Sequence, residues 1–326
     1  MRNFPHSRTL ATFLDSGKEF GFSRSNDDTV RQHPFALGDH GRTRVLEHFR
    51  NKKVAILGAG IIGGAMAQAL APYCEVTATR RNIEKLRYLE KMEIRISSDN
   101  RAAAEEADVV IVSVKPKQVV PVLLELRGAL ENKTVISMAA AIPLDIMKQT
   151  VPEAHYIRGM TNTAVQIRRA FTIFTCDSEV ASRERDMVRA LFGHLGEFEE
   201  VEEQYLDVLT AMSGSGPAYL YTVLEAMIYG ALRVGLPRDL ALKAAANTFI
   251  GAAHHLLSSG KHPAELRDQV VTPGGVTIEG IYELEDGRIR TAFMKAVSAA
   301  SQKATVIAED IRKYAEEQLA RENRKN

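Results

Sequence analysis

The chain has 326 residues, of which 45% are hydrophobic and 25% charged, a composition typical of a globular protein with room for about two domains. Its 42 Lys and Arg residues nearly balance its 41 Asp and Glu residues, so no overall positive charge attracts nucleic acid or acidic lipid. The composition excludes a chain that is disordered or fibrous throughout. Any anionic partner must be held by a local site.

Residues 1–53 are interpreted as an N-terminal extension of unknown role, because they lack a sustained hydrophobic period and the apolar core of a secretory signal. Residues 54–72 are apolar and long enough to suggest a membrane span, but Gly and Ala make up most of them and contribute little transfer free energy. We therefore expect no membrane segment. The two cysteines, Cys74 and Cys176, are far apart and favour a reduced, cytoplasmic protein.

From about residue 52, short apolar runs alternate with helical stretches. The runs are VAIL, EVTAT, EIRI, DVVIVSV and KTVISMA, and the stretches are GIIGGAMAQAL, NIEKLRYLEKM, DNRAAAEEA, KQVVPVLLEL and PLDIMKQT. This alternation is typical of a parallel sheet with helices on both faces. HYIRGMTN and FTIFTC are expected to extend the sheet, before a helix near 179–191. The pattern predicts a Rossmann-like, doubly wound α/β domain over residues 54–204.

Strand patterns end at about residue 201, and residues 205–326 are predicted to form an all-helical second domain. A first helix has Pro217 near its start and Gly235 and Pro237 past its end, and a second ends at Gly260. A helix, a glycine turn and another helix follow, and a last helix runs over 289–319. The Ala-rich helices carry long apolar faces, which fit burial against a second copy of the chain.

A glycine-rich turn follows the VAIL strand directly and opens a helix. Its residues are Gly58, Ala59, Gly60, Ile61, Ile62 and Gly63, which match the dinucleotide fingerprint in the context that the fingerprint requires. Gly58 permits the tight turn, Gly60 lets the backbone approach a pyrophosphate, and Gly63 lets helix and strand pack closely. The phosphates are then expected at the N-terminus of the helix.

The end of the second strand carries no carboxylate to accept hydrogen bonds from an NAD ribose. It reads Thr79, Arg80, Arg81 and Asn82 instead. Two guanidinium groups about twenty residues past the glycines can bind a 2′-phosphate, which favours NADPH as the cofactor, with NADH as the alternative. An ordinary solvated arginine pair is the other interpretation of this motif.

A second glycine turn lies between two predicted helices, with the sequence Thr272-Pro273-Gly274-Gly275-Val276-Thr277. Such a turn leaves consecutive backbone N–H groups exposed and has no Cβ to keep a ligand away, so it can hold a carboxylate. By pattern alone, a plain loop between helices is equally compatible with these residues.

Three further features are assigned no chemistry. His254 and His255 are adjacent on a helix, point about 100° apart and have no partner at ligand spacing, so no metal site is predicted. Ser213-Gly214-Ser215-Gly216-Pro217 is expected to cap the following helix. The acidic side chains at positions 199, 200, 202 and 203 are expected to form a solvated turn.

Most of the chain resembles the pyrroline-5-carboxylate reductases. The likeness is carried by SGSGPAYLYTVLEAM, GLPRDLALKAA and especially LRDQVVTPGGVTIEGIYELE, which follow a dinucleotide domain containing SVKP, and it spans about residues 54–308. The resemblance implies reduction of the cyclic imine 1-pyrroline-5-carboxylate to L-proline, the last step of proline biosynthesis, with NAD(P)H as the hydride donor. A reductase of another cyclic imine and a non-catalytic NADP-binding regulator are the alternatives.

The resemblance also implies site residues. Thr277 would place its hydroxyl against the imine nitrogen, while Thr272 and the amides of Gly274, Gly275 and Val276 would hold the substrate carboxylate. Further cofactor contacts would be Asn82, Asn100, Ser113, Val114, Lys115, Pro116, Met138, Ala139 and Ala140. Family members are dimers with interlaced helical domains, often stacked into larger rings, so a homodimer or larger homo-oligomer is expected.

One loop departs from the family pattern. Where the family usually has Met-Pro-Asn-Thr-Pro, this chain has Met160-Thr161-Asn162-Thr163-Ala164. The loop is expected beside the nicotinamide, and without its two prolines it should be more flexible. This departure bears on turnover and ring preference and not on the fold.

Overall fold

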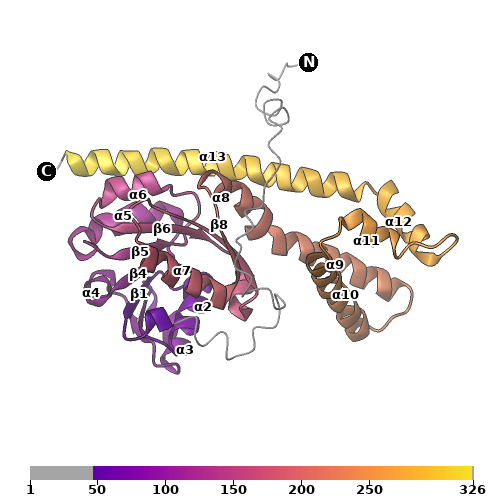
Figure 1. Cartoon of the computed structure of the whole chain (residues 1–326), viewed down its shortest axis with the longest axis horizontal. Helices are drawn as coiled ribbons and strands as arrows, with labels where there is room; N and C mark the ends of the chain where they lie inside the picture. Colours follow the sequence, from indigo (N-terminus) through magenta and orange to yellow (C-terminus); the bar gives the residue numbers. More distant parts are fainter. Residues whose placement is uncertain (1–46, 325–326) are drawn as a thin grey trace, which may run out of the picture. The chain divides into compact units, whose positions relative to one another are not determined.

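The computed structural model describes residues 47–324, and most of the predicted extension therefore lies outside the described residues. Its centre is one eight-stranded sheet with the order β3-β2-β1-β4-β5-β6-β7-β8 (Figure 1). The strands are β1 (Lys53–Leu57), β2 (Glu75–Thr79), β3 (Arg95–Ser97), β4 (Val109–Val112), β5 (Thr134–Ser137), β6 (His155–Met160), β7 (Ala170–Cys176) and β8 (Gly196–Glu200). The first six strands have the strand order of a Rossmann fold and are mutually parallel, so the predicted doubly wound sheet is confirmed.

The last two strands reverse the chain direction. β7 pairs antiparallel with β6, because the connection over residues 161–169 is too short for the crossover that a parallel neighbour needs. β8 then pairs parallel with β7, starting at Gly196 opposite Ala170. β8 was not predicted, because its GEFEE sequence has three glutamates and only one apolar side chain, Phe198.

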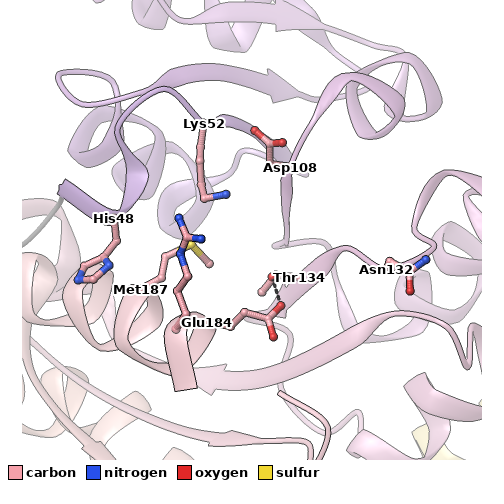
Figure 2. Close-up of a pocket in the computed structure, with 8 residues that line it drawn as sticks. His48, Lys52, Asp108, Asn132, Thr134, Glu184 and Met187 are labelled. Atoms are coloured by element: carbon pink, nitrogen blue, oxygen red, sulfur yellow. Dashed lines mark hydrogen bonds between the residues drawn. The ribbon is translucent and has the colours of Figure 1, made fainter. Parts of the chain in front are cut away.

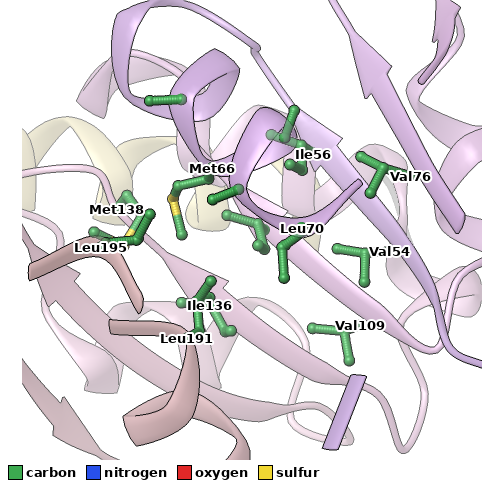
Figure 3. Packing of buried hydrophobic residues seen from close by; sticks show 14 of the residues in the cluster. Val54, Ile56, Met66, Leu70, Val76, Val109, Ile136, Met138, Leu191 and Leu195 are labelled. Atoms are coloured by element: carbon green, nitrogen blue, oxygen red, sulfur yellow. The ribbon is translucent and has the colours of Figure 1, made fainter. Parts of the chain in front are cut away.

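Each face of the sheet is covered by helices. One apolar cluster joins the strands to α2 (Ile61–Leu70) and α7 (Ser182–Leu195), as Figure 3 shows for Val54, Met66 and Leu191. The other cluster joins the strands to α4 (Asn100–Glu106), α5 (Val119–Glu125) and α6 (Leu144–Thr150). The centre of the sheet is therefore buried on both faces, which explains the nearly unbroken apolar runs of β1 and β4.

The crossover after β2 is more broken than expected. One helix was predicted over NIEKLRYLEKM, but the structure has a 3-10 turn, η2 (Ile83–Leu86), followed by the short α3 (Arg87–Glu90). Asn82 precedes this segment in an extended conformation and makes no capping hydrogen bond through its side chain. Without a side-chain cap, the first amides of the segment are left to turn-type bonds and to solvent. The remaining 3-10 turns are η1 (Glu47–Phe49), η3 (Pro116–Gln118), η4 (Arg127–Ala129) and η5 (Thr163–Ile167).

After β8 the described chain is helical, as predicted. The elements are α8 (Gln204–Leu209), the π-helical turn η6 (Thr210–Gly214), α9 (Gly216–Arg233), α10 (Arg238–Ser259), α11 (Pro263–Asp268), α12 (Val276–Asp286) and α13 (Ile289–Asn323). Pro217 lies in the first turn of α9, and α10 ends at Gly260 with a left-handed φ of 63°. The predicted start and stop residues of these helices are confirmed.

The last helix returns to the sheet domain. In Figure 1, α13 runs along the helices α5 and α6. Its residues Ile311, Ala315 and Leu319 are buried in the same apolar cluster as residues of α5 and α6, and Arg312 pairs with Asp145 at 2.8 Å. The end of α13 therefore contributes to the core of the first domain, although the proposed boundary at residue 205 assigns it to the second. Burial of this stripe explains how a helix longer than predicted is stabilised.

Candidate functional site

The glycine turn between β1 and α2 is fixed by the neighbouring strand. The backbone amides of Gly58 and Ala59 both donate to the carbonyl of Thr79, at 3.1 and 2.8 Å. Gly58 has a φ of +83°, and a Cβ there would lie 2.6 Å from the side chain of Val114. Only glycine can make this turn without strain.

The next two glycines have different surroundings. Gly60 is the residue before α2, it caps the helix without a side chain, and a Cβ built on it would come no nearer than 3.9 Å to its closest neighbour. Gly63 is buried, and a Cβ there would press on Ile56 and Ser113 at 3.1 and 3.2 Å. The turn therefore has open space at Gly60, beside the first amides of α2, and tight packing against the sheet at Gly63. Open space at the helix N-terminus fits a pyrophosphate.

Arg80 lies beside this turn. Its guanidinium donates to the carbonyl of Ala59 at 3.4 Å and is partly buried. Arg81 and Asn82 are exposed. The hydroxyl of Thr79 donates to Asn100 at 2.6 Å, which ties the end of β2 to the start of α4. These residues, like the fingerprint, lie at the carboxyl edge of the parallel strands, where ligands bind in open α/β sheets.

The other predicted cofactor contacts follow β4 and β5 at the same edge. The Ser113 amide donates to Leu57 at 2.8 Å, and the Met138 amide donates to Val112 at 2.8 Å. Val114 packs against the glycine turn, Lys115 is exposed and Pro116 opens η3. Met138 and Ala139 are buried, so Ala140 is the most accessible of that set. The structure brings the sets after β1, β2, β4 and β5 to one edge.

The loop after β6 is held by its own polar side chains. The Ala164 amide donates to the side-chain oxygen of Asn162 at 3.0 Å, and the hydroxyls of Thr161 and Thr172 lie 2.9 Å apart. The amide nitrogen of Asn162 also donates to the carbonyl and the hydroxyl of Ser213, both at 3.3 Å. These bonds restrain a loop that has lost both prolines of the family pattern.

The expected role of the SGSGP segment is wrong. Ser215 precedes α9 in a helical conformation and makes no capping bond through its side chain. The π-helical turn η6 runs directly into α9, and the Ser215 amide donates to the carbonyl of Thr210 at 3.1 Å. The backbone is thus continuous through this segment, so no free helix end remains for a serine to cap.

The acidic turn is also different from the expectation. Glu200 pairs with Arg185 and Arg189, both at 2.6 Å, and Glu203 pairs with Arg158 at 2.9 Å. Arg158 is almost fully buried in β6 and also pairs with Asp207 at 2.7 Å. The carboxylates at 200 and 203 therefore neutralise arginines of the sheet domain. Composition alone could not reveal these partners, which lie far away in sequence.

The second glycine turn precedes α12. The Gly275 amide donates to the carbonyl of Thr272 at 3.0 Å, and Gly274 has a φ of +67° with no atom within 4 Å of a built Cβ. A Cβ on Gly275 would lie 2.3 Å from the Thr272 hydroxyl. Val276 is 90% exposed and Thr277 is partly exposed. The turn at the start of α12 is thus open, so space exists for a ligand beside its first amides.

The two glycine turns lie on separate elements. The pocket that Gly60 lines, of about 440 Å³, is formed entirely by residues of the sheet domain, and α12 packs mainly against α13. The two predicted parts of the site, the dinucleotide turn and the turn before α12, therefore lie in different parts of this chain.

A further polar pocket lies at the opposite, amino edge of the strands and was not predicted. It has a volume of about 310 Å³ and is shown in Figure 2. Of its lining residues, Thr134 donates its hydroxyl to Glu184 at 2.5 Å, and Nδ1 of His155, which does not line the pocket, lies 3.0 Å from the same carboxylate. Its lining residues are His48, Lys52, Asp108, Asn132, Thr134, Arg183, Glu184 and Met187.

The remaining candidates from the sequence are the histidine pair and the two cysteines. His254 and His255 are exposed, and no three His, Cys, Asp or Glu side chains among residues 47–324 are placed to hold a metal ion. Burial is the main cause that raises the pKa of Cys74 to about 12 and of Cys176 to about 11, and neither forms a disulfide. None of the described helices is long and apolar enough to cross a membrane.

The sheet order, the glycine turn and Arg80 define a dinucleotide-binding domain of the kind found in oxidoreductases. Comparison with known proteins agrees. Residues 53–141 match the family model described as NADP oxidoreductase coenzyme F420-dependent, and residues 203–307 match the model for pyrroline-5-carboxylate reductase dimerisation.

Relatives identify the family. The chain is 36% identical over 259 residues to a pyrroline-5-carboxylate reductase of Arabidopsis thaliana, covering 77% of this chain and 94% of the plant protein. It is 36% identical to that of Methanosarcina acetivorans, covering 78% and 97%. A crystal structure of Plasmodium falciparum pyrroline carboxylate reductase with NADP bound has a TM-score of 0.72 and 26% identity, covering 80% of this chain and 99% of that one. The chain belongs to the pyrroline-5-carboxylate reductase family.

Proposed function

We propose that this protein reduces 1-pyrroline-5-carboxylate to L-proline, using NADPH as the preferred cofactor. The observation that carries the proposal is the pair of open glycine turns, one at the start of α2 and one at the start of α12, in a chain of this family. The first has the shape needed for a dinucleotide pyrophosphate, and the second has the shape needed for a small carboxylate.

The sheet domain holds the cofactor. The pyrophosphate binds at the first-turn amides of α2, in the open space beside Gly60. Arg80 supplies positive charge at the end of β2. The residues after β4 and β5 line the path toward the nicotinamide end. NADPH, when bound, supplies the hydride for the reduction.

The turn before α12 holds the substrate. The amides of Gly274, Gly275 and Val276 bind its carboxylate without presenting a cation that would repel a protonated imine. Thr277, one residue into the helix, offers its hydroxyl to the ring nitrogen. Threonine is too weak an acid to be the proton source alone, so its role is to hydrogen-bond and orient the ring.

A second copy of the chain completes the helical domain. No residue of α9, α11 or α12 is buried in the single chain, and large apolar side chains such as Tyr221, Leu257 and Tyr282 are more than half exposed. An apolar cavity of about 560 Å³ between α9 and the α12–α13 turn is lined by residues such as Met227, Leu284 and Phe293. Apolar surface on this scale supports a homodimer or larger homo-oligomer. Sedimentation velocity of the purified protein should show a dimer or a larger oligomer. A monomer at micromolar concentration would contradict this part of the proposal.

The assay that tests the activity follows NADPH or NADH absorbance with a panel of cyclic imines of five- and six-membered rings. The five-membered 1-pyrroline-5-carboxylate should give the highest kcat/KM, and a six-membered imino acid with a higher value would assign the other cyclic imine instead. Tight cofactor binding without turnover of any imine would favour a non-catalytic role. Two free, partly buried cysteines support a reducing compartment such as the cytoplasm.

A further inference from the structure

A pocket beside α2 is lined by basic residues and by no acidic residue. Its volume is about 440 Å³, and it begins at Gly60 in the fingerprint turn. No lining residue is acidic, whereas two are arginines, Arg80 and Arg168. The lining residues are Gly60, Ile61, Ala65, Gln68, Ala69, Arg80, Tyr88, Met92, Val165, Gln166 and Arg168.

Arg168 has an unusual backbone for its residue type. It follows η5 in the left-handed region, with φ 56° and ψ 40°, where glycine would fit without strain. Its side chain is partly buried, and among residues 47–324 its guanidinium forms no ion pair and donates no hydrogen bond to a side chain. With no acidic residue among those that line the pocket, the Arg168 guanidinium is available to pair with a bound anion.

The other walls of the pocket suit a nucleotide. Arg80 comes from the end of β2, where an adenosine ribose lies in this fold class. Tyr88 is half exposed and lies over α2, where a Cβ on Gly64 would come within 2.5 Å of its hydroxyl. Gly64 thus allows an aromatic ring to form one wall. By contrast, Arg81 is exposed and is not among the lining residues.

We propose that Arg168 is a specificity-determining residue, which together with Arg80 binds the phosphate on the adenosine ribose of NADP. The inference rests on the proposed function for the identity of the cofactor. The sequence pattern predicts the pair Arg80 and Arg81 for this phosphate, whereas the arginines that line the pocket are Arg80 and Arg168.

The position of Arg168 links the phosphate to the loop after β6. Arg168 and Arg169 bond back through their amides to Val165 and Ala164, each at 3.1 Å. The segment is continuous with the Met160–Ala164 loop that has lost its prolines. A phosphate held by Arg168 therefore restrains this loop when NADP binds and leaves it freer when NAD binds.

The test measures binding of 2′-phosphoadenosine 5′-phosphate by calorimetry, with 5′-AMP as the probe that lacks the 2′-phosphate. Arg168→Ala should weaken binding of the first probe roughly tenfold or more and leave 5′-AMP unchanged, as expected for one charge-assisted contact. Arg168→Gly should bind as weakly as Arg168→Ala and melt at an equal or higher temperature, because glycine relieves the left-handed strain. Arg169→Ala is the matched control, since it removes the neighbouring charge outside the pocket.

The outcomes separate this inference from the proposed function. Unchanged binding of 2′-phosphoadenosine 5′-phosphate in both Arg168 variants would overturn the inference, as would an equal loss for 5′-AMP or an equal loss in Arg169→Ala. In each of these cases the wild-type protein can still reduce the imine. A different pair of results would support the phosphate site and refute the proposed activity: the Arg168 variants selectively lose binding of 2′-phosphoadenosine 5′-phosphate, and the wild-type protein reduces no imine.

Discussion

Asn162 donates its side-chain amide to both the carbonyl and the hydroxyl of Ser213, at 3.3 Å each. The contact joins the loop after β6 to the π-helical turn η6, which leads into α9. The loop of the sheet domain and the first turn of the helical region are therefore positioned together. Because the two proposed halves of the site belong to these two regions, this contact bears on how they are oriented.

Asn162→Ala should lower kcat, and the loss of three side-chain hydrogen bonds should also lower the melting temperature by a few degrees. A neutral hydrogen bond contributes about 1 kcal/mol, so a loss of roughly fivefold in turnover is expected if the bond positions the loop. Steady-state kinetics with both substrates checks this. Thr163→Ala is the control, since Thr163 is exposed in the same loop. Equal kinetics for Asn162→Ala and the control would contradict the positioning role.

Gly58→Ala should abolish cofactor binding. The new Cβ would lie 2.6 Å from Val114 in a left-handed backbone that disfavours any side chain. The turn must shift, and the amides that receive the pyrophosphate shift with it. Fluorescence titration with NADPH measures the loss, and Gly128→Ala, where a Cβ meets nothing within 4 Å, serves as the control. Wild-type affinity in a folded Gly58→Ala protein would refute the assigned pyrophosphate site.

Removing the carboxylate partners of Arg158 should lower the free energy of unfolding more than removing Arg158 itself. Arg158 is 4% exposed, whereas its partners Glu203 and Asp207 are about one-third exposed. The double change Glu203→Gln with Asp207→Asn leaves a buried, unpaired cation and should lower the free energy of unfolding by about 3–5 kcal/mol. Arg158→Met leaves carboxylates that reach water and should have a smaller effect. Urea unfolding compares the two, and the reverse order would contradict the burial argument.

Glu184 should make stability sensitive to acid. Burial favours the neutral carboxyl, but hydrogen bonds from Thr134, His155 and the Ala181 amide outweigh it and hold the pKa of Glu184 below its ordinary value of 4.5 (Figure 2). A carboxyl whose pKa is lower when folded stabilises the protein above pH 4.5, and this contribution is lost as pH falls below that value.

The variant Glu184→Gln lacks this titration. Its unfolding free energy should be lower than that of the wild type near neutral pH, and the difference should shrink below pH 4.5. Denaturant unfolding at several pH values measures the difference, and Glu131→Gln, at an exposed position, is the control. A difference that grows on acidification would contradict the assigned direction of the shift.

The sheet domain was readable from the sequence because its signals are local. Apolar runs such as VAIL and DVVIVSV identify doubly buried strands, and the glycines of the turn are fixed by backbone geometry that only glycine tolerates. The same reasoning located the turn before α12, where Gly274 and Gly275 stand between two helical patterns.

What the sequence could not indicate depends on pairings between distant segments. The charged β8 is a strand because β7 offers it an edge, and Glu203 is neutralised by an arginine 45 positions away. Arg168 reads as a surface residue until the fold places it in the same pocket as Arg80. The return of α13 to the sheet domain depends on a stripe, Ile311, Ala315 and Leu319, whose partners no local pattern specifies.

The most direct measurement of the central claim follows the hydride itself. The purified protein is given 1-pyrroline-5-carboxylate and NADPH that carries deuterium at both hydrogen positions of nicotinamide C4, and the product is analysed by NMR. We predict L-proline with a single deuterium on the ring carbon next to nitrogen and away from the carboxylate. Unlabelled proline, label on the carbon that bears the carboxylate, or no proline while NADPH remains bound would each contradict it.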